Sequence, residues 1–338
     1  MSIVSNLNEA APLLDVSGLI TQFPNDENRM IQILRGVSFQ LGRGEVLGLV
    51  GESGSGKSVT GFSIMNLIEQ PATVSGGSVR FAGEELVGLG ESAMRSLRGR
   101  KIAMIFQDPM MTLNPVLRID TQMIETLQAH ETISREEAWK RSRDALALVG
   151  IPRPEERLSA YPHEFSGGMR QRVAIAIAML HNPDLIIADE PTTALDVTVQ
   201  SQIIAELVQL TRKRNMSMIW ISHDLAIVSR LADRVAVMYA GQIVEMGSVH
   251  DVINNPQHPY TLGLIRSVPS QSPHGQRLQQ IPGIAPRLDK LPQGCAFRPR
   301  CERASEQCQV APELNPGQHQ ARCFHPTSQS HAASSASH

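Results

Sequence analysis

Residues 46–58 combine a short aliphatic run with a glycine-rich turn that ends in Lys-Ser. The turn, GESGSGKS, is a complete match to the pattern G-x-x-x-x-G-K-[ST], placed between an expected strand, Val46–Val50, and an expected helix. Its glycines let successive backbone N–H groups turn toward phosphate oxygens at the positive end of that helix. An ordinary glycine-containing turn is the alternative, but the Lys-Ser pair in this context favours a phosphate-binding loop. The residues expected to bind nucleotide here are Gly51, Ser53, Gly54, Ser55, Gly56, Lys57 and Ser58.

A magnesium site is expected where this loop meets a second strand. Lys57 can reach the β- and γ-phosphates of a nucleoside triphosphate, and the Ser58 hydroxyl is a ligand for Mg²⁺. The run Leu185–Ala188 has the pattern of a buried strand and delivers Asp189 and Glu190 at its carboxyl end. Because ligands of α/β sheets bind at that edge, we expect Asp189 to hold Mg²⁺ and Glu190 to polarise the attacking water. The alternative, two acids in a solvated loop, is disfavoured by the phosphate loop.

The composition of the 338-residue chain is that of a globular protein. Hydrophobic residues make up 41% and aromatic residues 4%, so the core is expected to be mainly aliphatic. A formal net charge of −2 argues against nucleic acid as the main ligand. The N-terminal segment has no basic leader, and no run approaches the ~18 apolar residues that cross a bilayer. We therefore expect a soluble protein on the cytoplasmic side, where clustered cysteines hold metal more often than they form disulfides.

Further motifs, taken in their order along the chain, resemble those of the ATP-binding-cassette (ABC) ATPases. The sequence Ser-Gly-Gly-Met-Arg-Gln at residues 166–171 resembles the signature sequence of this family and stands shortly before the acidic strand. Four other features resemble family motifs. Phe23 resembles the aromatic residue that stacks on adenine, and Gln107 resembles the glutamine of the glutamine loop. Ala194-Leu195-Asp196 resembles the aspartate loop, and His223 resembles the switch histidine. Each of these alone reads as an ordinary helix start, surface residue or core histidine. Their shared order and spacing over residues 12–270 carries the resemblance.

The resemblance implies that two cassettes pair head to tail and that each nucleotide lies between them. On its own side the chain would use Gln107, Glu190 and His223 as catalytic residues. Gln107 would also join Ser58 and Asp189 at Mg²⁺. The residues expected at the partner's nucleotide are Ser166, Gly167, Gly168, Gln171 and Asp196. The helix that Ser166 begins would supply an anion-binding end like that of the phosphate loop.

The expected fold is an α/β P-loop ABC ATPase. The resemblance implies a RecA-like core with an antiparallel β subdomain and a helical subdomain, spanning residues 12–255 with the helical subdomain at about 112–166. Within that insert Ser134 as N-cap, Glu137 three residues later and Gly150 as a stop predict one helix. Two short strands joined by a Tyr239–Gly241 turn are expected after His223.

The chain's four cysteines all lie in a proline-rich C-terminal extension, residues 256–326. We expect its prolines to favour extended linkers over packed helices. Its HPYTLGLI, IPG and LPQGCAFRPRC stretches resemble the C-terminal extension of peptide and nickel importer ATPases. Cys295, Cys301, Cys308 and Cys323 lack the close pairs typical of zinc sites. The resemblance implies a [4Fe–4S] cluster, with zinc and free or disulfide-bonded thiols as alternatives. Residues 327–338 are expected to form a disordered tail.

The resulting functional hypothesis is an ATP-hydrolysing subunit that powers peptide import. The expected partners are a second ABC ATPase subunit, which is a homologue or another copy, two transmembrane permease subunits and an extracytoplasmic solute-binding protein, with no nucleic acid. The expected location is peripheral, on the cytoplasmic face of the inner membrane. Nickel or metal chelates, glutathione and opine-like solutes remain alternative cargoes. A cassette ATPase acting on DNA or ribosomes is the rival class, but such proteins usually carry two cassettes or a long coiled-coil insert, and this sequence has neither.

Overall fold

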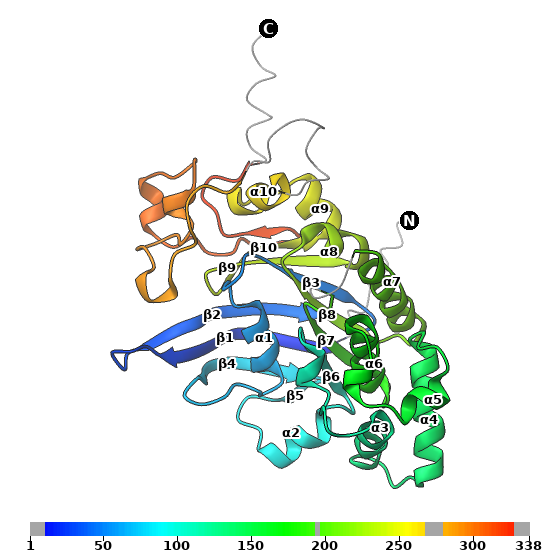
Figure 1. Cartoon of the computed structure of the whole chain (residues 1–338). Coiled ribbons are helices and arrows are strands. Elements are labelled where there is room, and N and C mark those ends of the chain that lie inside the picture. The colour runs from blue at the N-terminus through cyan, green and yellow to red at the C-terminus, as the bar shows by residue number, and fades with distance from the viewer. Residues whose placement is uncertain (1–10, 193–196, 268–279, 328–338) are drawn as a thin grey trace, which may run out of the picture.

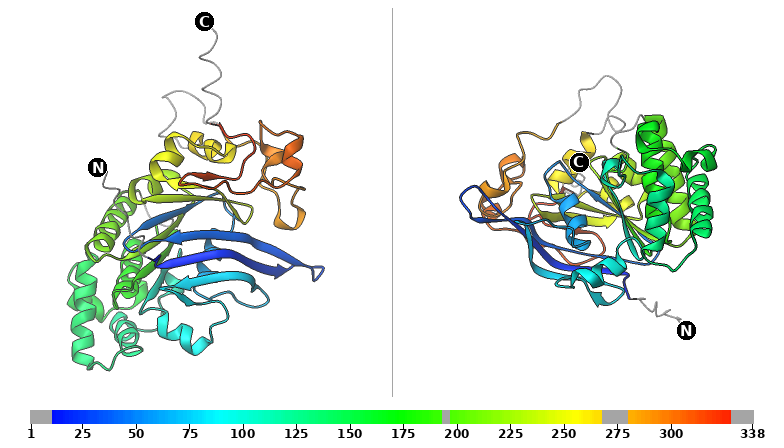
Figure 2. Two further views of the ribbon diagram at one scale, coloured as in Figure 1. Left: turned by 180° about the vertical axis from the view of Figure 1, so that it is seen from behind. Right: turned by 60° about the horizontal axis from the view of Figure 1, so that its bottom comes forward.

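A computed structural model describes residues 11–192, 197–267 and 280–327 of the chain. A seven-stranded sheet lies at the centre, and a four-stranded sheet lies beside it (Figure 1). The helical insert and the C-terminal extension lie at opposite sides of these sheets in all three views (Figures 1 and 2). No helix within the described ranges is both long and apolar enough to cross a bilayer. The predicted α/β architecture with an antiparallel and a helical part is confirmed.

The larger sheet has the order β11-β10-β9-β3-β8-β7-β6. Its strands are β3 (Val46–Val50), β6 (Ile102–Ile105), β7 (Leu185–Asp189), β8 (Ser217–Ser222), β9 (Arg234–Tyr239), β10 (Gln242–Ser248) and β11 (Gln320–Ala321). Strands β3, β8, β7 and β6 run parallel, and every residue of these four strands is buried. Such continuous apolar runs are what a sheet covered on both faces requires. The carboxyl ends of the four strands therefore meet at one edge of the sheet.

The smaller sheet is antiparallel, with the order β2-β1-β4-β5. Its strands are β1 (Leu14–Pro24), β2 (Met30–Leu41), β4 (Thr73–Phe81) and β5 (Glu84–Glu85). Buried and exposed positions tend to alternate along these strands, as expected when one face packs on the core and the other meets solvent. Strands β1 and β2 extend as a long hairpin that ends beside the C-terminal extension (Figures 1 and 2).

Ten α-helices lie in the described ranges. They are α1 (Lys57–Ile64), α2 (Glu91–Leu97), α3 (Ile119–Gln128), α4 (Arg135–Leu148), α5 (Pro154–Leu158), α6 (Gly167–Met179), α7 (Val197–Lys213), α8 (Leu225–Leu231), α9 (Val249–Asn254) and α10 (Pro259–Arg266). Short 3-10 turns are η1 (Pro109–Met111), η2 (Pro162–Glu164), η4 (Leu288–Lys290), η5 (Arg298–Arg300) and η6 (Glu306–Gln309). Of these, α3, α4, α5 and η2 form the helical insert.

Two local predictions are confirmed. The Ser134 hydroxyl caps α4 by accepting from the backbone N–H of Glu137 at 3.2 Å, and Gly150 follows the helix with a left-handed φ of 71°. Strands β9 and β10 form the expected hairpin, whose turn residues Ala240 and Gly241 both have positive φ, 46° and 78°. Such values are those of a two-residue turn that matches the twist of the flanking strands.

The C-terminal extension differs from expectation in its first part. Residues 259–266 were expected to form an extended linker, but they form helix α10. Pro259 occupies the first turn, where its missing N–H is harmless, and the His258 side chain caps the helix by accepting from the N–H of Tyr260. Tyr260 and Phe297 are buried in the main core, so the extension does not stand as a separate unit.

The last described residues continue this attachment. Strand β11 pairs with β10 and adds an edge to the main sheet. The N–H of Thr327 donates to the carbonyl of Gln257 at 2.9 Å. The remainder of the predicted disordered tail, residues 328–338, lies outside the described residues.

Candidate nucleotide site

The phosphate loop connects β3 to α1 with the backbone geometry that its glycines allow. Gly51, Gly54 and Gly56 have φ values of 155°, 77° and 104°, which residues with a Cβ rarely adopt. A Cβ on Gly51 would lie 2.2 Å from the carbonyl oxygen of Met238, and one on Gly56 would lie 2.9 Å from Leu34. Glycine is therefore required where the loop passes between β2 and β9. The other loop residues, Ser53, Ser55, Lys57 and Ser58, follow the same turn, with Ser53 and Gly54 exposed at its mouth.

Lys57 lies at the centre of this loop and is only 5% exposed. Its Nζ donates to the carbonyl oxygens of Gly51 at 2.8 Å and Glu52 at 3.0 Å. Burial lowers the pKa of this ammonium, and the acidic side chains of Glu190, Asp189 and Glu52 act in the opposite direction. A bound phosphate would supply the counter-charge that the buried ammonium lacks, so the site favours an anion at this point.

Ser58 and Asp189 meet at the edge of the sheet as predicted. The Ser58 hydroxyl donates to Oδ1 of Asp189 at 2.9 Å, although the two residues come from α1 and the end of β7. Burial raises the pKa of Asp189. A hydroxyl and a carboxylate side by side are ligands that Mg²⁺ prefers, and the cation would relieve the desolvated charge. These two residues therefore fit a magnesium site beside the phosphates.

Glu190 stands between the predicted glutamine and histidine. Its carboxylate lies 3.1 Å from Nδ1 of His223 and 3.5 Å from Nε2 of Gln107. Glu190 has a left-handed φ of 43°, held by its N–H, which donates to the carbonyl of Ile221 at 3.0 Å. Side chains that follow β6, β7 and β8 thus converge at one point. This carboxylate can accept a proton from a water molecule attacking the γ-phosphate.

The predicted signature begins helix α6. Ser166 is exposed and is the N-cap, since its hydroxyl accepts from the N–H of Met169 at 3.3 Å. Gly167 is also exposed, and Gly168 is half-buried. Gln171 is different: it is 2% exposed, and its Nε2 has no hydrogen-bond partner within the described part of the chain. The helix end is therefore open to a partner molecule, whereas the side chain of Gln171 points into the fold.

The two other predicted nucleotide contacts are Phe23 and Asp196. Phe23, at the end of β1, is 43% exposed, so its ring is accessible for stacking. Asp196 lies outside the described residues.

Sequence reasoning missed two residues that contact the phosphate loop from the C-terminal extension. The Tyr260 hydroxyl accepts from the N–H of Glu52 at 2.8 Å, and the Arg300 guanidinium binds the Glu52 carboxylate with two contacts of 2.7 and 2.9 Å. The contact of Tyr260 with the main chain has no signal in the sequence, whereas the need for a cation such as Arg300 is indicated by Glu52 itself. An acidic side chain in a loop that binds phosphate calls for a cationic neighbour.

The fold of the C-terminal extension places the four cysteines around one cavity, but their side chains do not converge on a single point. Cys295, Cys301, Cys308 and Cys323 line one cavity of about 10 Å³, and all four are free thiols. No three His, Cys, Asp or Glu side chains in the described ranges converge as the ligands of a metal ion do. Burial raises the pKa of Cys295 and Cys301, and that of Cys323 to about 11. These three thiols are therefore protonated at neutral pH unless a metal replaces the protons.

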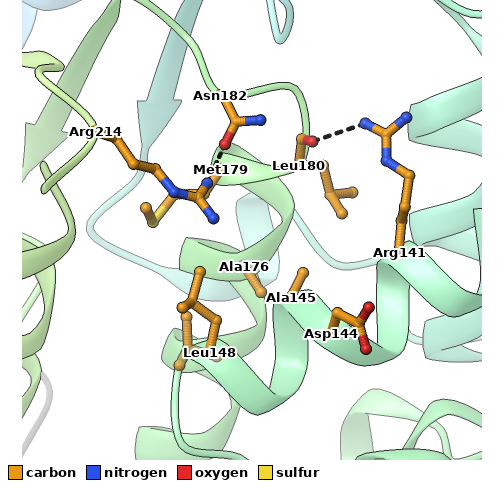
Figure 3. Close-up of a pocket in the computed structure, with 10 residues that line it drawn as sticks. Arg141, Asp144, Ala145, Leu148, Ala176, Met179, Leu180, Asn182 and Arg214 are labelled. Carbon is orange, nitrogen blue, oxygen red and sulfur yellow. Dashed lines mark hydrogen bonds between the residues drawn. The ribbon is translucent and has the colours of Figure 1, made fainter.

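A separate hollow of about 370 Å³ lies between α4 and α6 (Figure 3). The two arginines that line it already donate to protein acceptors, Arg141 to the carbonyl of Leu180 and Arg214 to Oδ1 of Asn182. The floor is apolar, with Ala145 among its residues. Since no glycine loop or acidic pair lines it, this hollow does not have the chemistry of a nucleotide site.

The phosphate loop lies at the carboxyl edge of the parallel sheet. Ser58 and Asp189, which fit a magnesium site, and the carboxylate of Glu190 lie beside it. This arrangement defines a nucleotide-hydrolysing cassette. Residues 34–193 match the family model described as "ABC transporter", and residues 244–308 match that described as "Oligopeptide/dipeptide transporter, C-terminal region". The chain belongs to the family of ABC transporter ATP-binding proteins, and it is an ATPase of that family.

Curated relatives and solved structures agree with this assignment. The chain is 52% identical over 265 residues to the oligopeptide transport ATP-binding protein OppD of Bacillus subtilis (strain 168), covering 78% of this chain and 74% of the relative. It is 49% identical over 269 residues to the dipeptide transport ATP-binding protein DppD of Haemophilus influenzae, covering 80% and 81%.

Two solved structures share the cassette fold. The dimeric post-hydrolysis state of the ATP-binding cassette MJ0796 bound to ADP and phosphate has a TM-score of 0.63 at 26% identity, covering 70% of this chain and 98% of that one. The cbiO1 protein from Clostridium perfringens, part of an ABC transporter complex, has a TM-score of 0.61 at 26% identity, covering 72% and 92%.

Proposed function

We propose that this chain hydrolyses MgATP as one of two cassettes that power the import of oligopeptides or dipeptides across the cytoplasmic membrane. The observation that carries the proposal is the convergence of Lys57, Ser58, Asp189 and Glu190 at one sheet edge in a chain whose C-terminal region matches peptide transporters. The names of its relatives at about half identity, oligopeptide and dipeptide transport ATP-binding proteins, favour peptides as the cargo.

In this proposal each residue has one task at the nucleotide. Lys57 exchanges its contacts with loop carbonyls for contacts with the β- and γ-phosphates. Ser58, Asp189 and Gln107 would hold Mg²⁺, which supplies charge neutralisation at the phosphates when bound. Glu190 accepts the proton of the attacking water, and His223, at 3.1 Å, orients that carboxylate.

The site is completed by a second cassette. Ser166 and Gly167 expose a helix end that its own chain leaves open, and an exposed helix start is an anion-binding group. Head-to-tail pairing would bring this end, with Gly168 and Asp196, to the nucleotide of the partner, which is a homologous subunit or a second copy. The dimeric form of the similar cassette MJ0796 supports the pairing.

The contact with the permease subunits is proposed at the segment after Gln107. Met111 and Val116 expose 67% and 74% of their surface there, between the glutamine and helix α3. Large apolar side chains that are exposed within one short segment are typical of protein-binding surfaces. Two membrane-spanning permeases would cover them at the cytoplasmic face of the inner membrane, while an extracytoplasmic binding protein delivers the peptide.

A [4Fe–4S] cluster is proposed at the four cysteines, with one zinc ion as the alternative. Four thiol donors around one cavity suit either group. A single zinc ion, with Zn–S bonds of about 2.3 Å, would draw the sulfurs to within about 4 Å of each other. A cluster would use all four cysteines as its ligands, and the four thiols that line one cavity offer such a set.

The metal is tested by anaerobic purification followed by iron, sulfide and zinc analysis. About four irons per chain and an absorption band near ~400 nm support the cluster, and one zinc ion overturns it in favour of the alternative. A protein without either metal would contradict both.

The cargo is tested on the assembled transporter in lipid nanodiscs. Trialanine-loaded binding protein should stimulate ATP hydrolysis, whereas the empty binding protein should not. Nickel, a metal chelate, glutathione and an opine serve as the competing ligands. Stimulation by one of these and not by trialanine would overturn peptide import while leaving the ATPase assignment intact.

A further inference from the structure

The phosphate loop carries a carboxylate of its own, that of Glu52. Its side chain is 29% exposed and lies close enough to the ammonium of Lys57 for its negative charge to oppose the lowering of that group's pKa by burial. Nucleotide phosphates bind at the same loop, so this negative charge opposes the binding of a polyanion unless a cation neutralises it.

Arg300 of the C-terminal extension supplies that cation. Its two terminal nitrogens bind the two oxygens of Glu52 at 2.7 and 2.9 Å, which is the bidentate geometry of an arginine and a carboxylate. The arginine side chain is 5% exposed. Its Nε donates to the carbonyl of Pro282 at 2.8 Å, and one terminal nitrogen lies 3.3 Å from the hydroxyl of Tyr239. The guanidinium is thus fixed on every side.

The main chain of Glu52 is held from the same direction. The hydroxyl of Tyr260 accepts its N–H at 2.8 Å. The ring of Tyr260 packs against those of Tyr239 and Phe297, with centroids 4.6 and 5.5 Å apart. Helix α10 and turn η5 therefore hold both the backbone and the side chain of one residue of the phosphate loop.

We propose that Arg300 is a positioning residue for MgATP, which neutralises Glu52 and fixes the phosphate loop from the C-terminal extension. Arg300 directly precedes Cys301, and the N–H of that cysteine donates to the carbonyl of Arg298 at 3.3 Å within the same turn. The position of the cysteine-bearing turn thereby sets the position of the guanidinium, and the extension acts on the nucleotide site of its own chain.

Loss of the positive charge of Arg300 should weaken MgATP binding only while Glu52 keeps its negative charge. Arg300→Met leaves the half-buried carboxylate of Glu52 uncompensated beside the phosphates, so MgATP binding should weaken by at least about tenfold, equivalent to about 1.4 kcal/mol. Removing that carboxylate as well, with Glu52→Gln in the same chain, should restore most of the affinity. A role of Arg300 in packing alone predicts no such rescue, because the second substitution restores no packing.

The test uses the full chain with its metal content preserved and fluorescent mant-ATP with Mg²⁺ as the probe. Dissociation constants are measured for the wild type, both single variants and the double variant, at low and at high salt. Arg287→Met is the matched control, because Arg287 pairs with Asp289 on the surface of the same extension. We expect the control to bind as the wild type does, and the deficit of Arg300→Met to shrink at high salt as the repulsion is screened.

Two further measurements separate positioning from folding. Arg300→Lys keeps the charge without the bidentate contact, so it should bind more tightly than Arg300→Met even if both lower the melting temperature. In the assembled transporter Arg300→Met should raise KM for ATP and leave kcat at saturating ATP within about twofold of the wild type. Equal affinities of Arg300→Met and the wild type, equal affinities of the Lys and Met variants, or a double variant as weak as Arg300→Met would each overturn the proposal. None of these outcomes depends on the cargo that the transporter carries.

Discussion

Replacing Glu190 by glutamine tests the hydrolytic site without changing its shape. The amide is nearly isosteric with the carboxylate and can keep contacts at the positions of His223 and Gln107, which lie at 3.1 and 3.5 Å. It cannot accept a proton from water. A positioned general base accelerates hydrolysis by about 10²- to 10⁴-fold, which is about 2.7–5.4 kcal/mol of the barrier at about 1.36 kcal/mol per tenfold.

The same substitution should not weaken nucleotide binding. Glu190 is one of the charges that raise the pKa of Asp189, so it adds negative charge beside the place where the phosphates bind. Removing that charge favours the polyanion. We therefore expect Glu190→Gln to bind MgATP at least as tightly as the wild type.

The assay is phosphate release by the assembled transporter, together with equilibrium MgATP binding by the same preparation. Glu84→Gln is the control, an exposed glutamate in strand β5 of the antiparallel sheet. We expect the turnover of Glu190→Gln to fall by about 10²-fold or more while MgATP binding is retained. Hydrolysis by Glu190→Gln within about fivefold of the wild type would refute the role of this carboxylate as the base.

Three other outcomes follow from particular residues. Met111→Asp should lower the peptide-stimulated ATPase activity of the complex by about tenfold or more, because it places a charge in the proposed apolar contact with the permeases. Val310→Asp is the control: Val310 is exposed to nearly the same degree, and its substitution should leave this activity unchanged. Burial lowers the pKa of His258 in the folded chain to about 4, whereas the pKa of a histidine in the unfolded chain is near 6.5. As the pH falls, the unfolded chain therefore binds the proton first. The contribution of His258 to stability is complete above about pH 6.5 and is lost as the pH falls toward 4. The free energy of unfolding, measured in urea, should fall between pH 7.5 and pH 5 by about 2 kcal/mol less in His258→Asn than in the wild type. An unchanged pH dependence of this free energy would contradict the prediction. Gly51→Ala should abolish mant-ATP binding, since its Cβ would meet a carbonyl oxygen at 2.2 Å, whereas Gly90→Ala, with open space around it, should bind normally.

The parts of the site that the sequence could predict are those with a local signal. The phosphate loop, the strand before Asp189 and the Ser134 cap each depend on residues within a few positions of one another. Parallel strand order then brings Ser58 and Asp189 together, because buried strands of one sheet end at the same edge.

For the contact of Arg300 with Glu52, the acidic loop residue indicates that a cation is needed, but no local pattern indicates which residue supplies it. The two residues are 248 positions apart, and only the packing of the C-terminal extension on the main core brings them together. Helix α10 was missed for a different reason. The prolines around it are typical of an extended chain, whereas Pro259 stands in the first turn of a helix, which tolerates proline.

The central claim, that ATP hydrolysis at this site drives peptide import, is tested most directly by transport in proteoliposomes. The vesicles contain both permeases and both cassettes, with the binding protein and radiolabelled trialanine on the side opposite the cassettes and MgATP on theirs. We expect uptake that requires MgATP with the wild-type chain and none above background with Glu190→Gln. Undiminished uptake with that variant, or hydrolysis by the wild type without any uptake of the peptide, would contradict the account.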